Sequence, residues 1–406
     1  MKHSASAVGA ALLAAMSGAA MAQSSVTLYG TADAGLLSIS NASPGTLGYV
    51  PSAANSGHKT TFKDGGLGAS NWGLKGTEDL GNGTRAMFQF QGNVNTASGA
   101  AGGPNSSSGQ SFFNQMAVVG FAGRFGEIKF GRQVSPMYYA MASTDARQAR
   151  YFGSSLTALV GLNSASGAFL GNNSNAAFGT IYNDSAIVYT SPTWNNLTFN
   201  LGLSVDGNAG SWRANSQQTA TLMYSQGGLR LSALYYNGYG NNLPTATALY
   251  TAKLGSAAAA STAVAAAGFT PMANTNRLAA VGALYNWNAF TVSGSYFVAS
   301  NPSKAVVPGG STSLRMWSLG AGWKIQPHIQ LTAGYYRITD RTNDGHSASQ
   351  LALGLDYALS KRTVLYVQGA AVRNTGGNMN LSPVYATPVA AGHNSNAWML
   401  GIRHSF

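Results

Sequence analysis

The sequence has no cysteine and very little charge. Disulfide cross-links and thiolate metal sites are therefore excluded anywhere in its 406 residues. Only 8% of the residues are charged, whereas a soluble globular domain carries about 25%. Long apolar runs are also missing: beyond the N-terminus, no strongly apolar stretch reaches the roughly 18 residues that a membrane-spanning helix needs. These absences exclude a helical membrane bundle and do not fit an ordinary water-soluble domain.

Glycine and tyrosine, by contrast, are abundant. Glycine accounts for 51 residues, roughly twice its usual share of about 7%, without the period of three found in collagen. Tyrosine outnumbers phenylalanine, 19 to 16, and the mean hydropathy is −0.01. This composition, without helical spans, indicates a β-barrel in a membrane. The formal net charge of +12 raises nucleic-acid binding as an alternative, but the basic residues are scattered rather than clustered.

Residues 1–22 have the features of a secretory signal peptide. Lys2 and His3 give a basic start, an alanine-rich apolar stretch follows, and residues 20–22 form the small-x-small sequence AMA of a cleavage site. A short membrane anchor is the alternative, but the segment is too short and too rich in alanine for one. We expect residues 1–22 to be removed and residues 23–406 to form the folded domain.

The rest of the chain alternates apolar and polar residues with a period of two. Trp72, Leu74 and Gly76 share one face of such a segment, and Phe88 and Phe90 share one face of the next. This period predicts β-strands with one apolar face. Because the other face is polar enough for water, the strands are expected to separate lipid from a wet lumen.

Short and long connections alternate between these segments and predict sixteen strands. The short turns cover residues 78–83, 123–126, 192–196, 226–228, 286–288, 326–327 and 360–361. The longer links cover residues 38–66, 95–110, 135–180, 207–216, 240–273, 300–312, 341–346 and 375–393. The alanine-rich residues 257–267 fall in one of these links, and we interpret them as a loop with at most a short helix. Short turns on one rim and long loops on the other are typical of outer-membrane barrels.

The last segment, residues 398–406, predicts a strand that closes the barrel. Trp398, Leu400, Ile402, His404 and Phe406 share one face of it. An ordinary edge strand is the alternative, but pairing with the first strand, near residues 25–36, would leave no open edge.

Several motifs, in order along the chain, resemble those of a known family. They are VTLYG at 26–30, WGLKG at 72–76 followed by EDLG at 78–81, FG at 125–126 followed by FGRQ at 130–133, YTSP at 189–192, LSKRT at 359–363 and GIRHSF at 401–406. With these motifs the chain resembles the trimeric general porins of Gram-negative bacteria over nearly all of its mature length.

The resemblance implies an all-β fold: a 16-stranded antiparallel transmembrane β-barrel with short periplasmic turns, long extracellular loops and an inward-folded third loop. It also implies a homotrimer in the cell outer membrane, surrounded by lipid and lipopolysaccharide and passing small hydrophilic solutes. The tyrosines and tryptophans near strand ends are interpreted as interfacial girdles, with a sugar-binding track in the lumen as the alternative. No cofactor, metal or nucleic acid is implied.

The pore constriction is expected where the third loop faces the opposite wall. In that loop Asp145 matches a carboxylate of relatives, and Arg147 and Arg150 are the nearby cations. The wall positions at which relatives carry arginines correspond here to Asn71, Gln115 and Tyr182, none of which is basic. Arg132 shares a face with Ile128 and Phe130, so it is expected at a strand end or in a subunit interface rather than in the pore.

These features predict an outer-membrane diffusion channel with a modest anion preference, since Arg147 and Arg150 outnumber Asp145 in the loop. A substrate-preferring channel for a neutral or anionic small molecule is the alternative. An enzyme is not expected, because the histidines are dispersed and no nucleophile motif accompanies them.

Overall fold

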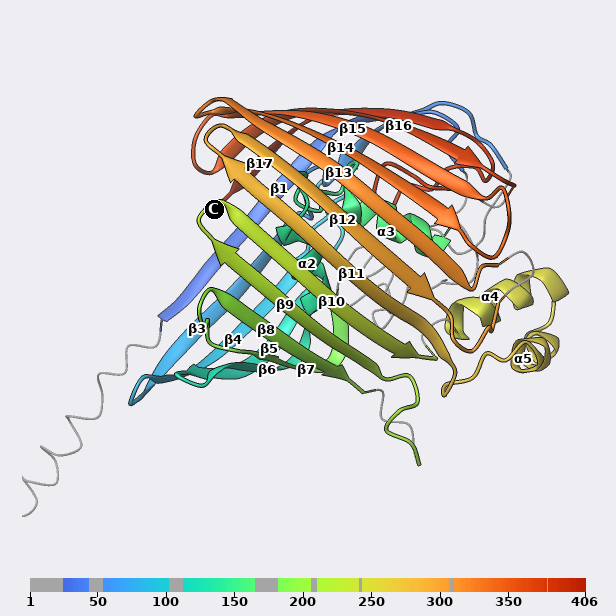
Figure 1. Cartoon of the computed structure of the whole chain (residues 1–406), viewed down its shortest axis with the longest axis horizontal. Helices are drawn as coiled ribbons and strands as arrows, with labels where there is room; N and C mark the ends of the chain where they lie inside the picture. Colours follow the sequence, from blue (N-terminus) through green and yellow to red (C-terminus); the bar gives the residue numbers. More distant parts are fainter. Residues whose placement is uncertain are drawn as a thin grey trace, which may run out of the picture.

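The computed structural model describes residues 25–43, 54–101, 112–164, 182–205, 210–240, 243–306, 310–377 and 379–406 (Figure 1). The predicted signal peptide, residues 1–22, lies outside the described residues. Among the helices of the described residues, none is long and apolar enough to cross a membrane.

The described strands form one antiparallel sheet of seventeen strands that closes on itself where β17 pairs with β1. The first half of the sheet comprises β1 (Ser25–Ile39), β2 (Lys59–Asp64), β3 (Asn71–Gly81), β4 (Thr84–Asn93), β5 (Met116–Gly123), β6 (Gly126–Val134), β7 (Tyr182–Thr190), β8 (Leu197–Ser204) and β9 (Gln217–Gln226). The second half comprises β10 (Leu229–Tyr239), β11 (Asn274–Trp287), β12 (Phe290–Ser300), β13 (Ser313–Gln326), β14 (Ile329–Asp340), β15 (Ser347–Ala358), β16 (Thr363–Thr375) and β17 (Ser395–Ser405). Closure leaves no unpaired edge, as the C-terminal sequence predicts.

Two of the seventeen strands share one position in the ring, so the barrel has sixteen positions, as predicted. β2 pairs with residues 34–39 of β1, and β3 pairs with residues 25–31 of the same strand. Between them the chain leaves the sheet over residues 65–70. The side chain of Asp33, completely buried, holds this excursion by accepting hydrogen bonds from the backbone N–H groups of Gly66, Leu67 and Gly68 at 2.8–3.0 Å.

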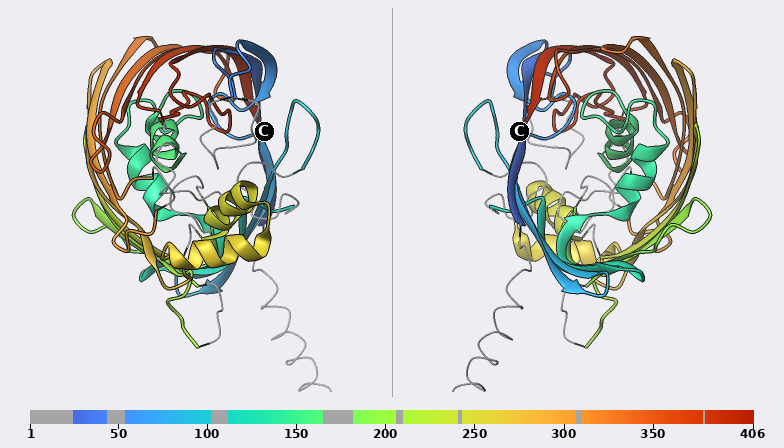
Figure 2. Two further views of the ribbon diagram at one scale, coloured as in Figure 1. Left: turned by 90° about the vertical axis from the view of Figure 1, so that its right-hand side faces the viewer. Right: turned by 90° about the vertical axis from the view of Figure 1, so that its left-hand side faces the viewer.

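All seven predicted short turns are confirmed at one rim of the barrel. The turn between β3 and β4 shows why they form: Asn82 and Gly83 both have positive φ, 54° and 74°, which matches the twist of a tight hairpin. The links at the opposite, extracellular rim are longer. The link between β10 and β11 contains α4 (Leu243–Leu254) and α5 (Ala257–Ala266), so the alanine-rich segment is a helix of three turns rather than a loop. Figure 2 shows this helical pair at the mouth of the barrel.

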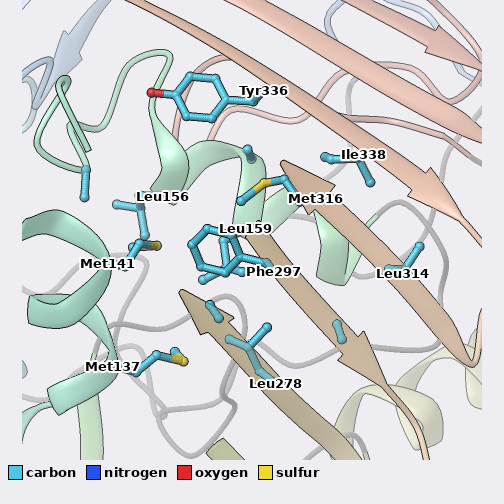
Figure 3. Packing of buried hydrophobic residues seen from close by; sticks show 14 of the residues in the cluster. Met137, Met141, Leu156, Leu159, Leu278, Phe297, Leu314, Met316, Tyr336 and Ile338 are labelled. Carbon is cyan, nitrogen blue, oxygen red and sulfur yellow. The ribbon is translucent and has the colours of Figure 1, made fainter. Parts of the chain in front are cut away.

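The third loop leads inward from β6 and carries α2 (Pro136–Ser143) and α3 (Ser155–Ser164). Figure 2, seen along the barrel, shows both helices inside the ring of strands; α2 contacts β8 to β10, and α3 contacts β14. The main apolar core therefore lies inside the barrel, between this loop and the wall. Figure 3 shows Met137, Met141, Leu156 and Leu159 of the loop facing Leu278, Phe297, Leu314, Met316 and Ile338 of the strands.

The last long link also folds inward, which the sequence interpretation does not predict. Residues 379–391 pack against the third loop: the Tyr151 and Tyr385 rings lie 4.5 Å apart, and Phe152 forms a β-bridge with Val384. Leu381 and Val389 are almost completely buried. The lumen is thus narrowed by the third loop, by residues 379–391 and by the excursion at residues 65–70.

Candidate functional site: the constriction and the cavity below it

The third loop is fastened to the inner wall strand by strand. The hydroxyl groups of Thr144 and Ser232 on β10 lie 3.0 Å apart, and the backbone N–H of Ala146 donates to Ser293 on β12 at 3.0 Å. Tyr336 on β14 donates to Asp145 at 2.9 Å, and the hydroxyl of Thr157 donates to Gln350 on β15 at 3.2 Å. The loop therefore follows the wall around the barrel instead of crossing the lumen.

Glycines on neighbouring strands make room for the loop and form what we call the inner track. They are Gly282 on β11, Gly320 on β13, Gly334 on β14 and Gly354 on β15. A Cβ atom at Gly320 would lie 2.8 Å from the Cβ of Ala146, and one at Gly334 or Gly354 would lie 2.9 Å from the side chain of Arg147. A Cβ at Gly282 would overlap the hydroxyl of Thr144. These four glycines allow the loop backbone to lie directly on the wall.

Asp145 is an anchor of this loop rather than an open charge in the pore. Its carboxylate accepts five hydrogen bonds: from the backbone N–H groups of Arg147, Ala149 and Ser155, and from the hydroxyl groups of Ser155 and Tyr336, all at 2.7–3.1 Å. Two of these donors belong to Ser155, the first residue of α3, where a negative charge is favoured by the helix dipole. The side chain is buried, so its charge acts on the loop itself.

Arg147 differs from the sequence interpretation, which places its charge in the pore. The side chain is 0% exposed. Its guanidinium donates to the carbonyl oxygens of Phe152 and Gly153, to the hydroxyl of Thr332 and to the side chain of Gln368, at 2.5–3.0 Å. Burial lowers the pKa of Arg147 to about 10, so the group is still protonated at neutral pH. Arg147 therefore holds the loop tip against β14 and β16 and presents no surface to solutes.

Arg150 does line an open cavity, but its charge is paired with a carboxylate. Its guanidinium forms a two-pronged ion pair with the carboxylate of Asp356 on β15, at 2.9 and 2.5 Å. Asp356, and not Asp145, is thus its counter-ion. Both residues line a cavity of about 550 Å³, which we call the lower cavity.

Of the three wall residues that match arginine positions of relatives, two lie together and one does not. Asn71 and Tyr182 line the lower cavity with Arg150. Gln115 does not: it is completely buried just before β5 and accepts a hydrogen bond from Gln91. The structure therefore brings three of the six predicted constriction residues to one cavity and places Asp145, Arg147 and Gln115 behind its surface.

Arg132 lies near the end of β6, as predicted, with a structural role. It forms an ion pair with Asp184 and donates to the carbonyl oxygen of Asn114 at 2.6 Å. The face expected from simple alternation does not apply, because the pairing shifts between Gly131 and Gln133 and Gly131 has a φ of 116°. The guanidinium of Arg132 lies 5.6 Å from the ring centre of Tyr182.

The lower cavity extends from the third loop to the turns at the periplasmic rim. Its polar and aromatic lining includes Asn71, Tyr138, Tyr139, Gln148, Arg150, Tyr151, Tyr182, His328, Asp356, Lys361, Arg362 and Arg403. The lining thus contains four basic side chains and one carboxylate, Asp356, which is already paired with Arg150. Among the described residues, Lys361, Arg362 and Arg403 form no ion pair.

These three basic residues are missing from the sequence interpretation, although a signal for them exists. Arg403 alternates with Ile402 and His404 of the outward face, which places it inside, and Lys361 and Arg362 form a predicted turn at the rim. What the sequence does not show is that the end of β17 and the turn between β15 and β16 meet below the third loop.

The described residues contain no group of three or more histidine and carboxylate side chains arranged to hold a metal ion. The arrangement is a cavity inside a closed barrel, lined by polar, aromatic and basic side chains.

Comparison with known proteins identifies the family. A family model described as Gram-negative porin matches residues 9–377. The chain belongs to the Gram-negative porin family. This porin is 29% identical over 405 residues to outer membrane porin protein 32 of Delftia acidovorans, covering 98% of this chain and 99% of that protein. It is 27% identical over 350 residues to major outer membrane protein P.IA of Neisseria meningitidis serogroup C, covering 82% of this chain and 81% of that protein.

Solved structures share the fold of this porin. The anion-selective porin from Comamonas acidovorans superimposes with a TM-score of 0.71 at 22% identity, over 95% of this chain and 100% of that chain. The trimer form of OmpT from Vibrio cholerae gives a TM-score of 0.61 at 15% identity, over 94% and 99%. The predicted 16-stranded barrel is confirmed, and the porin is an outer-membrane diffusion channel.

Proposed function

We propose that this porin passes small hydrophilic solutes with a preference for anions, and that the preference arises in the lower cavity. The observation that carries the proposal is the charge of the lining: Lys361, Arg362 and Arg403 are unpaired there, while the one carboxylate, Asp356, is neutralised by Arg150. The description of the Comamonas acidovorans structure as anion-selective agrees with this proposal.

The position of these charges decides their effect. Salt screens a charge in open water beyond about 8 Å at physiological ionic strength. Within a narrow passage walled by protein and lipid, the field is focused along the pore and acts on every passing ion. The three basic side chains therefore affect selectivity more than the exposed cations of the extracellular loops, and the preference weakens as the salt concentration rises.

The proposal includes the finer features of a passive porin. Residues 1–22 act as a signal peptide and are removed, the mature chain assembles as a homotrimer, and it lies among outer-membrane lipid and lipopolysaccharide. The OmpT structure in trimer form supports the assembly. The porin is not an enzyme and uses no cofactor; its described histidines support this, since His404 bonds to Thr363, His58 bonds to Ser38, and His328 lies in the lower cavity without a group of metal-binding side chains around it.

A second candidate is a channel that prefers one class of small anionic or neutral solute. The observation in its favour is the aromatic part of the lining: Tyr138, Tyr139, Tyr151 and Tyr182 face the cavity together with the basic residues. Saturable block of the ion current by one solute, absent with others of similar size, would support this candidate over a general channel.

The test is the reversal potential of the porin in a planar bilayer under a potassium chloride gradient. We expect the wild type to favour chloride, and the variant K361Q/R362Q/R403Q to lose at least half of the chloride-to-potassium permeability ratio. The matched control K253Q/K304Q/R341Q removes three exposed charges near the extracellular rim and should leave the ratio within about a fifth of the wild-type value. A cation-selective wild type, or equal shifts in the two variants, would contradict the proposal.

A further inference from the structure

The excursion at residues 65–70 is an insertion into one position of the barrel wall. β2 ends at Asp64, opposite Ala34 of β1, and β3 begins at Asn71, opposite Thr31 of the same strand. Only two residues of β1 separate these partners, whereas six residues of the chain separate β2 from β3. Four residues are therefore surplus, and without them β2 and β3 would form one strand in unbroken register with β1.

The excursion leaves the sheet beside two opposite charges. Asp33 of β1 lies directly opposite Arg403 of β17, and both side chains face the inside of the barrel. Residues directly opposite on antiparallel strands have Cβ atoms about 4.5–5.5 Å apart, and pairs of opposite charge there stabilise a sheet. The pairing of the strands alone therefore predicts an ion pair between these two residues.

The structure has no such ion pair, because the carboxylate of Asp33 is bound to the excursion instead. Among the described residues, neither Asp33 nor Arg403 takes part in an ion pair. The carboxylate accepts hydrogen bonds from three backbone N–H groups, those of residues 66–68, and from the hydroxyl of Tyr366, at 2.6–3.0 Å. A carboxylate has about four acceptor sites, so these donors satisfy it without a cation.

Gly68 lies against both charged groups. Its backbone N–H donates to Asp33 at 2.9 Å, and a Cβ atom at Gly68 would lie 3.8 Å from a guanidinium nitrogen of Arg403. Arg403 is partly exposed and lines the lower cavity. The carboxylate is thus bound by the backbone of the excursion, and the cation is left on the side of the cavity. A guanidinium without a carboxylate partner can form charge-assisted hydrogen bonds with a passing anion.

Two side chains of β16 hold the excursion in this position. Tyr366 reaches its partner across β17, where its ring lies over Gly401: a Cβ atom at Gly401 would come within 2.3 Å of the ring. Gln368 donates to the carbonyl oxygen of Gly66 at 3.2 Å and accepts a hydrogen bond from Arg147 at 2.9 Å. The excursion is therefore tied to the third loop as well as to the wall.

We propose that the excursion is a selectivity element: it binds the carboxylate of Asp33 and thereby keeps the guanidinium of Arg403 unpaired for passing anions. Asp33, Tyr366 and Gln368 are then positioning residues that act through Arg403. The inference rests on the proposed function, because Arg403 is one of the three cations that give the lower cavity its positive charge. It adds that a segment without a charged side chain, residues 65–70, controls that charge.

The test is a variant that lacks residues 66–69, measured as the reversal potential in a planar bilayer under a potassium chloride gradient. The deletion removes four residues and no charged side chain, so β2 and β3 can join in register. We expect Asp33 to pair with Arg403 and the chloride-to-potassium permeability ratio to fall at least twofold. Single-channel conductance should rise, because residues 67–69 no longer line the lower cavity.

The same deletion in a D33N background separates the loss of a free cation from a change in pore width. With no carboxylate left to pair with Arg403, the deletion should raise the conductance as before but change the permeability ratio by less than a third relative to D33N alone. An equal fall in the ratio with and without Asp33 would overturn the inference and make the excursion a size constriction only. An unchanged ratio in the simple deletion would also overturn it.

A point substitution tests the inference without removing backbone. Y366F removes one donor to Asp33 and should lower the permeability ratio by at least a quarter. The matched control Y236F removes a buried hydroxyl whose acceptor is the neutral side chain of Gln217, at 2.8 Å, and should leave the ratio within about a tenth of the wild-type value. Equal ratios in Y366F and Y236F would overturn the inference, even where the deletion variant does not assemble. A wild type that favours potassium would instead contradict the proposed function, because the inference concerns only the direction of change between variants.

Discussion

Three arginines close to one another in the lumen have three different roles because their partners differ. Arg147 is surrounded by neutral oxygen atoms and anchors the loop. Arg150 is paired with Asp356, and Arg403 faces the lower cavity and forms no ion pair with a described residue. The net charge that a solute meets in the lumen is thus set by which arginines are paired. It cannot be obtained by counting the charged residues of the third loop.

Substitutions of the Arg150–Asp356 pair should change selectivity in opposite directions. In R150Q an unpaired carboxylate is left in the cavity, so the reversal potential should move toward cations; in D356N the freed arginine should move it toward anions. The double variant R150Q/D356N removes a neutral pair and should stay near the wild type. Breaking a fully buried pair costs about 3–5 kcal/mol, and less is expected here because the pair borders the cavity. Shifts of the same sign in both single variants would contradict this assignment.

At the scale of single elements, the position of the third loop depends on the inner track, whose glycines leave room for the loop against the wall. G320V should force the loop away from β13, because even a Cβ atom there comes within 2.8 Å of Ala146. Overpacking of this kind costs about 1–3 kcal/mol, measurable as a lower temperature of barrel unfolding. Because the loop can move only toward the lumen, single-channel conductance should fall and open-channel noise should rise.

A matched control for this substitution exists on β16. A Cβ atom at Gly369 meets nothing within 4 Å, so G369V places the same side chain on a barrel strand without touching the third loop. We expect its conductance and unfolding temperature to match those of the wild type. Equal conductance in G320V, G369V and the wild type would show that the loop does not depend on the inner track.

The elements that the sequence predicts well are those with local causes. The seven turns follow from residues such as Asn82 and Gly83, and the strands follow from alternation. The excursion at residues 65–70 depends on Asp33, and the inward packing of Tyr385 depends on Tyr151, more than two hundred residues away. Contacts so distant in sequence leave no local pattern, which is why Asp145 and Arg147 could be placed in the right loop but not behind its surface.

At the scale of the whole molecule, the two halves of the barrel should differ in how strongly their backbone amides are protected from hydrogen exchange. The hydrogen bonds that fasten the third loop to the inner wall lie on β10, β12, β14, β15 and β16, so the second layer braces that side of the barrel rather than β3 to β6. Backbone amides of β11 to β15 should therefore exchange with deuterium more slowly than those of β3 to β6, by at least tenfold at matched strand positions. Hydrogen exchange with mass spectrometry on the detergent-solubilised porin measures this, and uniform exchange around the ring would contradict it.

The fastening of the third loop across neighbouring strands also has a mechanical consequence. A single layer of β-sheet bends easily. A second layer that is hydrogen-bonded to several strands resists bending, because bending requires neighbouring strands to slide past one another. Ser232, Ser293, Tyr336 and Gln350 provide such cross-links on β10, β12, β14 and β15. Under lateral pressure from the membrane, the cross-section of the barrel should flatten on the side of β3 to β6, while the curvature of the braced side, and with it the shape of the constriction, is preserved.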